Sequence, residues 1–125
     1  MSKQNIVKEK SKKFAIRIIN LFKYLRDEKK EHVLSKQILR SGTSIGANIR
    51  EAEHAQSNDD FTHKTNIALK EANETEYWLE LLHETDFITE EQYQSIKADC
   101  AELCRILISI IKTLKSKTKS NYICD

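Results

Sequence analysis

Residues 61–82, FTHKTNIALKEANETEYWLELL, carry the clearest fold signal in this sequence. The heptad positions alternate at intervals of four and three without a slip: Phe61, Thr65, Ala68, Ala72, Thr75, Leu79 and Leu82. This spacing is typical of one face of an α-helix that packs against other helices. The stretch therefore predicts a long helix over about 58–84. Ser57 would cap its first turn, and Asp59 and Asp60 would favour that turn electrostatically.

The same periodicity appears on both sides of this stretch. It predicts helices at about 3–27, 31–55 and 89–115, the last opening on the capping box Thr89-Glu90-Glu91-Gln92. Their core residues are Val7, Phe14, Ile18, Leu21 and Leu25; Leu34, Ile38, Ile45, Ile49 and Ala52; and Tyr93, Ile96, Cys100, Leu103, Leu107, Ile110 and Leu114. Short connections between four such helices predict an all-α, up-down-up-down antiparallel bundle over 1–118, followed by a C-terminal tail at 119–125.

Composition narrows the class of protein. The chain has 125 residues, enough for one domain, with no proline and two glycines, which disfavours an all-β fold. No apolar run is long enough to span a membrane, and the polar first residues do not resemble a secretion signal. We therefore expect a cytoplasmic protein whose three cysteines are reduced, with Cys100 and Cys104 as small core residues and Cys124 in the tail.

Basic residues gather near both ends of the chain, although the net charge is only +2. The candidates for phosphate contacts are Lys8, Lys12, Lys13, Arg17, Lys112 and Lys115. They either form a weak nucleic-acid surface or simply keep helix faces solvated. Binding through them would be salt-sensitive and independent of sequence, because it would depend on phosphate neutralisation alone.

Small and polar residues run beside the core stripe of the second predicted helix, at positions Gln37, Ser41, Ser44, Asn48 and Glu51. Gly42 and Gly46 lie in the same helix. A helical glycine costs about 1 kcal/mol relative to alanine, so we expect another backbone to approach closely. The small residues of 65–75 match this polar seam and predict a tight hairpin between the second and third helices.

The seam also carries a prediction about helix register. Gln37, Asn48 and Glu74 are expected to form hydrogen bonds that fix the alignment of the hairpin. Arg40 lies level with Glu74 and points away from its own core stripe, so it would reach Glu74 around the side or from a neighbouring subunit. The catalytic alternative is Glu74 as a general base.

The first and last helices carry a second apolar stripe each, with Ala15, Ile19 and Phe22 in one and Cys104, Ile108 and Ile111 in the other. Large exposed apolar surfaces are unusual on monomers. The stripes therefore predict a homo-oligomer that buries them between subunits. The alternative is a wide face that is entirely internal.

Two Glu-x-x-His sequences, ending at His54 and His83, resemble half of a di-iron site. In an antiparallel hairpin they lie at opposite ends, roughly 35–40 Å apart, so they cannot share a metal. Cys100 and Cys104 stand one turn apart, but no second Cys or His pair follows at zinc spacing. The sequence also has no phosphate-binding loop and no nucleophile with a readable base. We expect no catalytic residue, metal or cofactor.

Two stretches carry a family resemblance: Ser35-x-Gln37-Ile38-x-Arg40-Ser41-x-x-Ser44-Ile45-x-x-Asn48-Ile49-x-Glu51-Ala52, and Glu71-Ala72-x-Glu74-Thr75-x-Tyr77-Trp78-Leu79. They resemble the core motif of the bacterial 23S rRNA intervening-sequence proteins, the four helix bundle protein family. The resemblance covers about Ile6 to Leu114. It implies a left-handed bundle that assembles as a ring, typically a homopentamer. One relative, the accessory variability protein of diversity-generating retroelements, binds a reverse transcriptase and nucleic acid. The acidic connection at 56–60 departs from the basic loop of the family.

Two functions compete on this basis. The first is a non-enzymatic oligomeric scaffold or adaptor that binds a protein or nucleic-acid partner. The alternative is a direct, weakly specific RNA- or DNA-binding protein linked to rRNA intervening sequences. A steep salt dependence of binding would favour the second.

Overall fold

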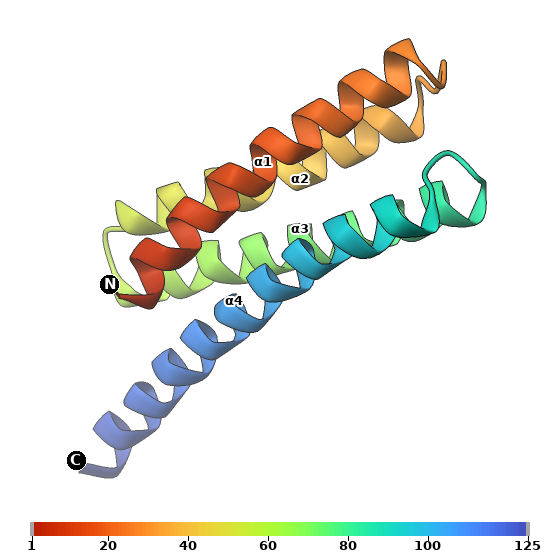
Figure 1. Cartoon of the computed structure of the whole chain (residues 1–125). Helices are drawn as coiled ribbons and strands as arrows, with labels where there is room; N and C mark the ends of the chain where they lie inside the picture. Colours follow the sequence, from red (N-terminus) through yellow and green to blue (C-terminus); the bar gives the residue numbers. More distant parts are fainter. Residues whose placement is uncertain (1, 125) are drawn as a thin grey trace.

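Four helices make up the computed structural model, which describes residues 2–124 and their side chains as far as Ser116. They are α1 (Lys3–Asp27), α2 (Leu34–Glu53), α3 (Asn58–Glu84) and α4 (Glu90–Cys124). Each helix packs against the next, and α1 also packs against α4, while the backbones of the diagonal pairs do not meet within 2–124. This order confirms the predicted all-α, up-down-up-down bundle. Figure 1 shows α4 diverging from the other helices toward its C-terminus.

The core follows the predicted stripes closely. The fully or almost fully buried side chains include Phe14, Ile18 and Leu25 in α1, Ile38 and Ile45 in α2, Ala72 and Leu79 in α3, and Cys100, Leu103 and Leu107 in α4. Phe61, Leu34 and Leu114, which lie near helix ends, are partly buried against this core. The heptad pattern therefore identified the buried face of every helix.

The predicted starts of α3 and α4 are also confirmed. The Ser57 hydroxyl accepts a hydrogen bond from the Asp60 backbone N–H at 3.0 Å. At the start of α4, the Gln92 N–H donates to the Thr89 hydroxyl at 3.1 Å, and the Thr89 N–H donates to the Gln92 side chain at 2.8 Å. Both arrangements satisfy amide groups that the first helical turn leaves without partners.

The second helix starts later than predicted, at Leu34 instead of about residue 31. The cause is Glu31, which is buried in the connection and uses its carboxylate as the cap. Its oxygens accept hydrogen bonds from the N–H groups of Val33, Leu34 and Ser35 at 3.1, 2.9 and 2.7 Å. A side chain engaged in this way lies before the helix, so the helical turns begin after it.

Two helix ends also differ from the prediction. The α2 helix ends at Glu53, with His54 as its C-cap, instead of near Ala55. The α4 helix continues to Cys124 instead of ending near Lys115, so helix extends through residues 119–124 of the predicted tail. No proline or glycine follows Lys115 in the sequence to stop the helix.

The two helical glycines face α1, and this explains their presence. A Cβ atom at position 42 would lie 2.8 Å from two side-chain carbons of Ile18, closer than such atoms can approach. At position 46 the nearest atom would be the Ser11 hydroxyl oxygen, at 3.3 Å. The predicted close approach is therefore real, and the partner is α1 and not α3.

Candidate functional site

The polar seam joins α2 to α3 through different residues from those predicted. The hydroxyls of Ser41 and Thr75 share a buried hydrogen bond of 2.9 Å across the two helices. Asn48 instead donates to the Ser44 carbonyl of its own helix at 2.8 Å, and the Ser44 hydroxyl donates to the Arg40 carbonyl at 2.6 Å. The prediction that Gln37 and Asn48 fix the register is therefore wrong, since Gln37 is exposed on the surface. Small hydroxyl side chains fit between closely packed helices where longer amides do not.

Arg40 lies where the hairpin alignment placed it, and it reaches α3 within the same chain. Its guanidinium pairs with the carboxylate of Glu74 and, at 3.2 Å, with that of Glu71. Glu74 therefore has a cationic partner and lies at the side of the hairpin. An ion-paired surface carboxylate is not the arrangement of a general base, so the contacts give the catalytic alternative no support.

Two of the four basic residues of α1 that were candidates for phosphate contacts are paired with acids. Lys8 contacts Glu53 of α2 at 2.9 Å, and Arg17 contacts Asp99 of α4 at 2.7 Å. Arg17 also donates to the backbone and side chain of Ser95. Each pair neutralises one positive charge that a phosphate would otherwise meet, so α1 is less available to nucleic acid than its sequence indicated.

The remaining candidates are exposed but do not form one patch. Lys12, Lys13, Lys112 and Lys115 have no ion-pair partner among the residues whose side chains are described. The contact of Lys3 with Ser109 fixes the alignment of the antiparallel α1 and α4. Lys112 and Lys115 therefore lie level with the start of α1. Lys12 and Lys13 lie roughly 18–24 Å further along the bundle.

One exposed apolar edge lies between α1 and α2. Ile19 keeps 37% of its surface exposed. It stands eleven residues, or three turns, after Lys8, and so shares the side of α1 that faces Glu53 of α2. Ala15 and Phe22 of the same predicted stripe are partly buried. This stripe therefore presents apolar surface at the α1–α2 edge of the single chain.

A second exposed edge lies between α3 and α4. Ile108 is 40% exposed and stands one turn after Cys104, which contacts Asn73 of α3. Ile111 of the same predicted stripe is only 6% exposed, so it belongs to the core. In a square arrangement of helices, the α1–α2 and α3–α4 edges face opposite directions. The molecule therefore carries apolar side chains on two opposite sides.

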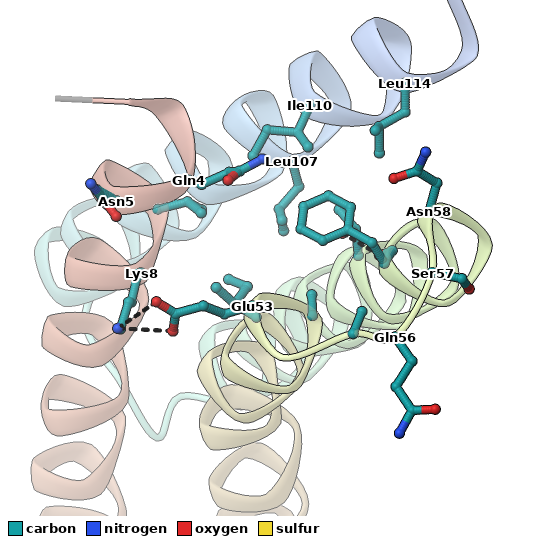
Figure 2. A pocket seen from close by; sticks show the side chains of 16 residues that line it. Gln4, Asn5, Lys8, Glu53, Gln56, Ser57, Asn58, Leu107, Ile110 and Leu114 are labelled. Atoms are coloured by element: carbon teal, nitrogen blue, oxygen red, sulfur yellow. Dashed lines mark hydrogen bonds and ion pairs between the residues drawn. The ribbon is translucent and has the colours of Figure 1, made fainter. Parts of the chain in front are cut away.

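A pocket of about 520 Å³ opens at the end of the bundle where α4 diverges. Figure 2 shows Leu107, Ile110 and Leu114 of α4 on one side of it, with Ser57 and Asn58 of the α2–α3 connection opposite. Lys8 and Glu53 pair at its rim. The pocket is the uncovered end of the apolar core, with polar groups around it.

The structure brings Glu76 of α3 to the two cysteines of α4. One carboxylate oxygen of Glu76 and the sulfur atoms of Cys100 and Cys104 all lie within 4.8 Å of one another. Sequence spacing missed this group because Glu76 lies in another helix. In an antiparallel helix pair, residues that are equally far from the connection lie side by side. Positions 76 and 100 are equally far from Ile88, so this rule would have placed Glu76 beside Cys100.

The two thiols differ in environment. Cys100 is fully buried, and its thiol donates to the Ala72 carbonyl at 3.3 Å. Its contact with the neighbouring thiol, together with burial, raises the pKa of Cys100 well above the usual range. The same contact lowers the pKa of Cys104, which is only partly buried. Cys104 is therefore the more accessible and more easily ionised thiol of the pair.

The two Glu-x-x-His sequences stay apart, as the hairpin geometry requires. His54 lies directly after α2 and His83 near the end of α3, at opposite ends of the antiparallel pair. His83 stacks on Tyr93 with ring centroids 4.3 Å apart and contacts Glu90 at 2.6 Å. These contacts join α3 to α4 and leave no shared di-metal geometry.

The helix order and the short connections define a small antiparallel four-helix-bundle protein. The chain matches the 23S rRNA-intervening sequence protein family over residues 3–109. It belongs to this family, as the resemblance in α2 and α3 indicated.

A solved structure extends this similarity. It is a crystal structure of a protein with unknown function from the S23 ribosomal protein family of Bacteroides thetaiotaomicron. The two sequences are 68% identical, the match covers 89% of this chain and 99% of the other, and the TM-score is 0.88. None of the curated proteins matches this sequence. Within residues 2–124, no helix combines the length and apolarity that crossing a bilayer requires.

Proposed function

We propose that this protein is a non-enzymatic scaffold that assembles with copies of itself and presents the assembly to a protein or nucleic-acid partner. The observation that carries the proposal is that two of the three exposed isoleucines in the described part of the chain, Ile19 and Ile108, lie on opposite edges of the bundle. Ion pairing of Lys8 and Arg17 supports assembly over direct phosphate binding by α1.

The placement of the two edges favours a particular kind of assembly. If the α1–α2 edge of one subunit contacts the α3–α4 edge of the next, the contact is head-to-tail, and repeated contacts close into a ring or continue as a filament. A closed ring matches the homopentamer that the family resemblance implies.

The test uses Ile19→Lys and Ile108→Lys variants, measured alone and mixed, by light scattering and native mass spectrometry. Each variant alone is expected to be monomeric, because a lysine in an apolar contact carries an unpaired charge. An equimolar mixture is expected to form a one-to-one dimer, because each variant retains the edge that the other has lost. Asn20→Lys and Ala98→Lys, at exposed positions rotated by about 80–100° from these edges, serve as controls and should retain the wild-type assembly.

Other outcomes contradict the proposal in distinct ways. A wild-type monomer at micromolar concentration would remove the basis for assembly. A second outcome is a dimeric wild type that only one of the two substitutions dissociates. It would show that the edge carrying this substitution pairs with the same edge of the other subunit. Unfolding of both variants in circular dichroism would show that the isoleucines belong to the core.

The second candidate is direct nucleic-acid binding, supported by the four exposed lysines without ion-pair partners in the described part of the chain. Their separation along the bundle favours weak contact with a phosphate backbone over recognition of one defined site.

A further inference from the structure

We infer that Cys100, Cys104 and Glu76 form a binding site for a single zinc ion between α3 and α4. The three potential ligand atoms lie within 4.8 Å of one another in the folded chain. Two thiolates and a carboxylate are a ligand set that Zn²⁺ accepts, with the fourth position filled by water. The inference does not depend on assembly or on the partner of the scaffold.

The geometry needs only small side-chain movements to hold the ion. Tetrahedral zinc with bonds of about 2.3 Å to sulfur places two sulfur atoms roughly 3.8 Å apart. Cys100 and Cys104 stand at the i, i+4 spacing that lets two side chains on one helix face the same ion. The three ligand atoms already lie within 4.8 Å of one another, so each needs to move by about 1 Å at most to reach such spacing.

The surroundings also favour a cation. Glu76 is partly buried and forms no ion pair with any described side chain, so its charge faces two thiols without a cationic partner. Cys104 is partly exposed and gives the ion a route to the site. The side-chain oxygen of Asn73 lies 3.8 Å from the Cys104 sulfur. In the metal-free chain the Cys104 thiol donates to this oxygen, and this bond would be given up when the thiol loses its proton to bind zinc.

Core packing alone accounts for Cys100 but not for the group. A buried thiol that donates to a carbonyl behaves as a small apolar residue with a satisfied donor. Core packing does not explain why the Glu76 carboxylate, which has no ion-pair partner among the described side chains, lies next to the partly exposed thiol of Cys104. The site is therefore distinguished by Glu76, which makes it the residue to test.

The experiment titrates the reduced full chain with Co²⁺ under anaerobic conditions and then with Zn²⁺. All proteins carry Cys124→Ser, which removes the third cysteine. The parent is expected to bind one Co²⁺ per chain, with thiolate-to-cobalt charge-transfer absorption that Zn²⁺ abolishes. Cys104→Ser should lose this absorption, and Glu76→Gln should weaken Co²⁺ binding at least about tenfold. The matched control, Glu84→Gln on the exposed surface of α3, should bind like the parent.

A second measurement covers the case in which Cys104→Ser does not fold. Zn²⁺ is expected to slow the alkylation of Cys104 by iodoacetamide in the parent, measured by mass spectrometry. The same Zn²⁺ should protect Glu76→Gln much less at equal concentration. Absence of charge-transfer absorption in the parent would overturn the inference, as would equal Co²⁺ affinity of Glu76→Gln and Glu84→Gln.

Discussion

Glu31 shows how one side chain sets the start of a helix. Burial disfavours its charged form, but hydrogen bonds from the N–H groups of Leu34, Ser35 and Val33 outweigh burial and lower the pKa of its carboxyl. The carboxylate also lies at the positive end of the α2 dipole, which stabilises it further. The ionised form is thus built into the connection between α1 and α2.

This arrangement predicts an acid-dependent loss of stability. Glu31→Gln should lower the free energy of unfolding by about 1–2 kcal/mol near neutral pH. Because the folded pKa is depressed, the Glu31 contribution is complete above the ordinary glutamate pKa and is lost as pH falls through the folded value. Urea unfolding of both proteins at several pH values should therefore give curves that converge in acid. Glu28→Gln, at an exposed position, is the control, and a constant offset for Glu31→Gln at all pH values would contradict the account.

The thiol group illustrates what sequence spacing can and cannot show at this scale. Cys100 and Cys104 are visible as an i, i+4 pair in the sequence. Their third neighbour, Glu76, becomes apparent only when α3 and α4 are aligned about their connection. The hydrogen bond between Ser41 and Thr75 was even harder to predict. In a sequence, two hydroxyl residues that bond to each other look the same as small residues that merely allow close packing.

At the scale of the helices, α2 leaves no room for a side chain between itself and α1 at Gly42. Gly42→Ala should destabilise the fold by about 1–3 kcal/mol, because its Cβ would clash with the fully buried Ile18. Helix propensity acts in the opposite direction by about 1 kcal/mol. At position 46 the added Cβ would lie 3.3 Å from the Ser11 hydroxyl oxygen and 3.6 Å from two Ser11 carbons, so Gly46→Ala should be close to neutral. Thermal unfolding of the two variants measures the difference, and equal losses would argue against the Ile18 clash.

Helix positions and buried faces were predictable because period and burial are directly linked. The buried residues of α3, from Thr65 to Leu82, are the heptad positions of its sequence. The boundaries were less predictable where the signal was unusual. Glu31 caps α2 from three residues before its first residue, Leu34. The sequence pattern instead predicted that the helix begins at Glu31 itself. The end of α4 lacked any breaker from which to place it.

At the scale of the whole molecule, charge distribution decides what nucleic acid can bind. We expect weak, sequence-independent binding whose affinity falls linearly on a log–log plot against salt. The double variant Lys12→Gln/Lys13→Gln should reduce the magnitude of that slope by about 1.4, because each phosphate contact on a single strand contributes about 0.7. The double variant Lys8→Gln/Arg17→Gln should change it less, because Glu53 and Asp99 already neutralise these residues. Fluorescence anisotropy with labelled single-stranded RNA measures both slopes. A tight complex with one RNA hairpin at physiological salt would instead indicate direct recognition.

The two ends of the bundle are built differently, and this has a dynamic consequence. The end with the α1–α2 and α3–α4 connections carries the Glu31 cap and the His83–Tyr93 stack. The other end has one connection and the pocket beside Leu107, Ile110 and Leu114. Transient local opening should therefore begin at the pocket. In this motion the C-terminal part of α4 moves away from the bundle while its start stays packed. In hydrogen–deuterium exchange, amides of 108–116 should exchange faster than those of 93–103. Uniform protection along α4 would show that the pocket does not loosen the helix.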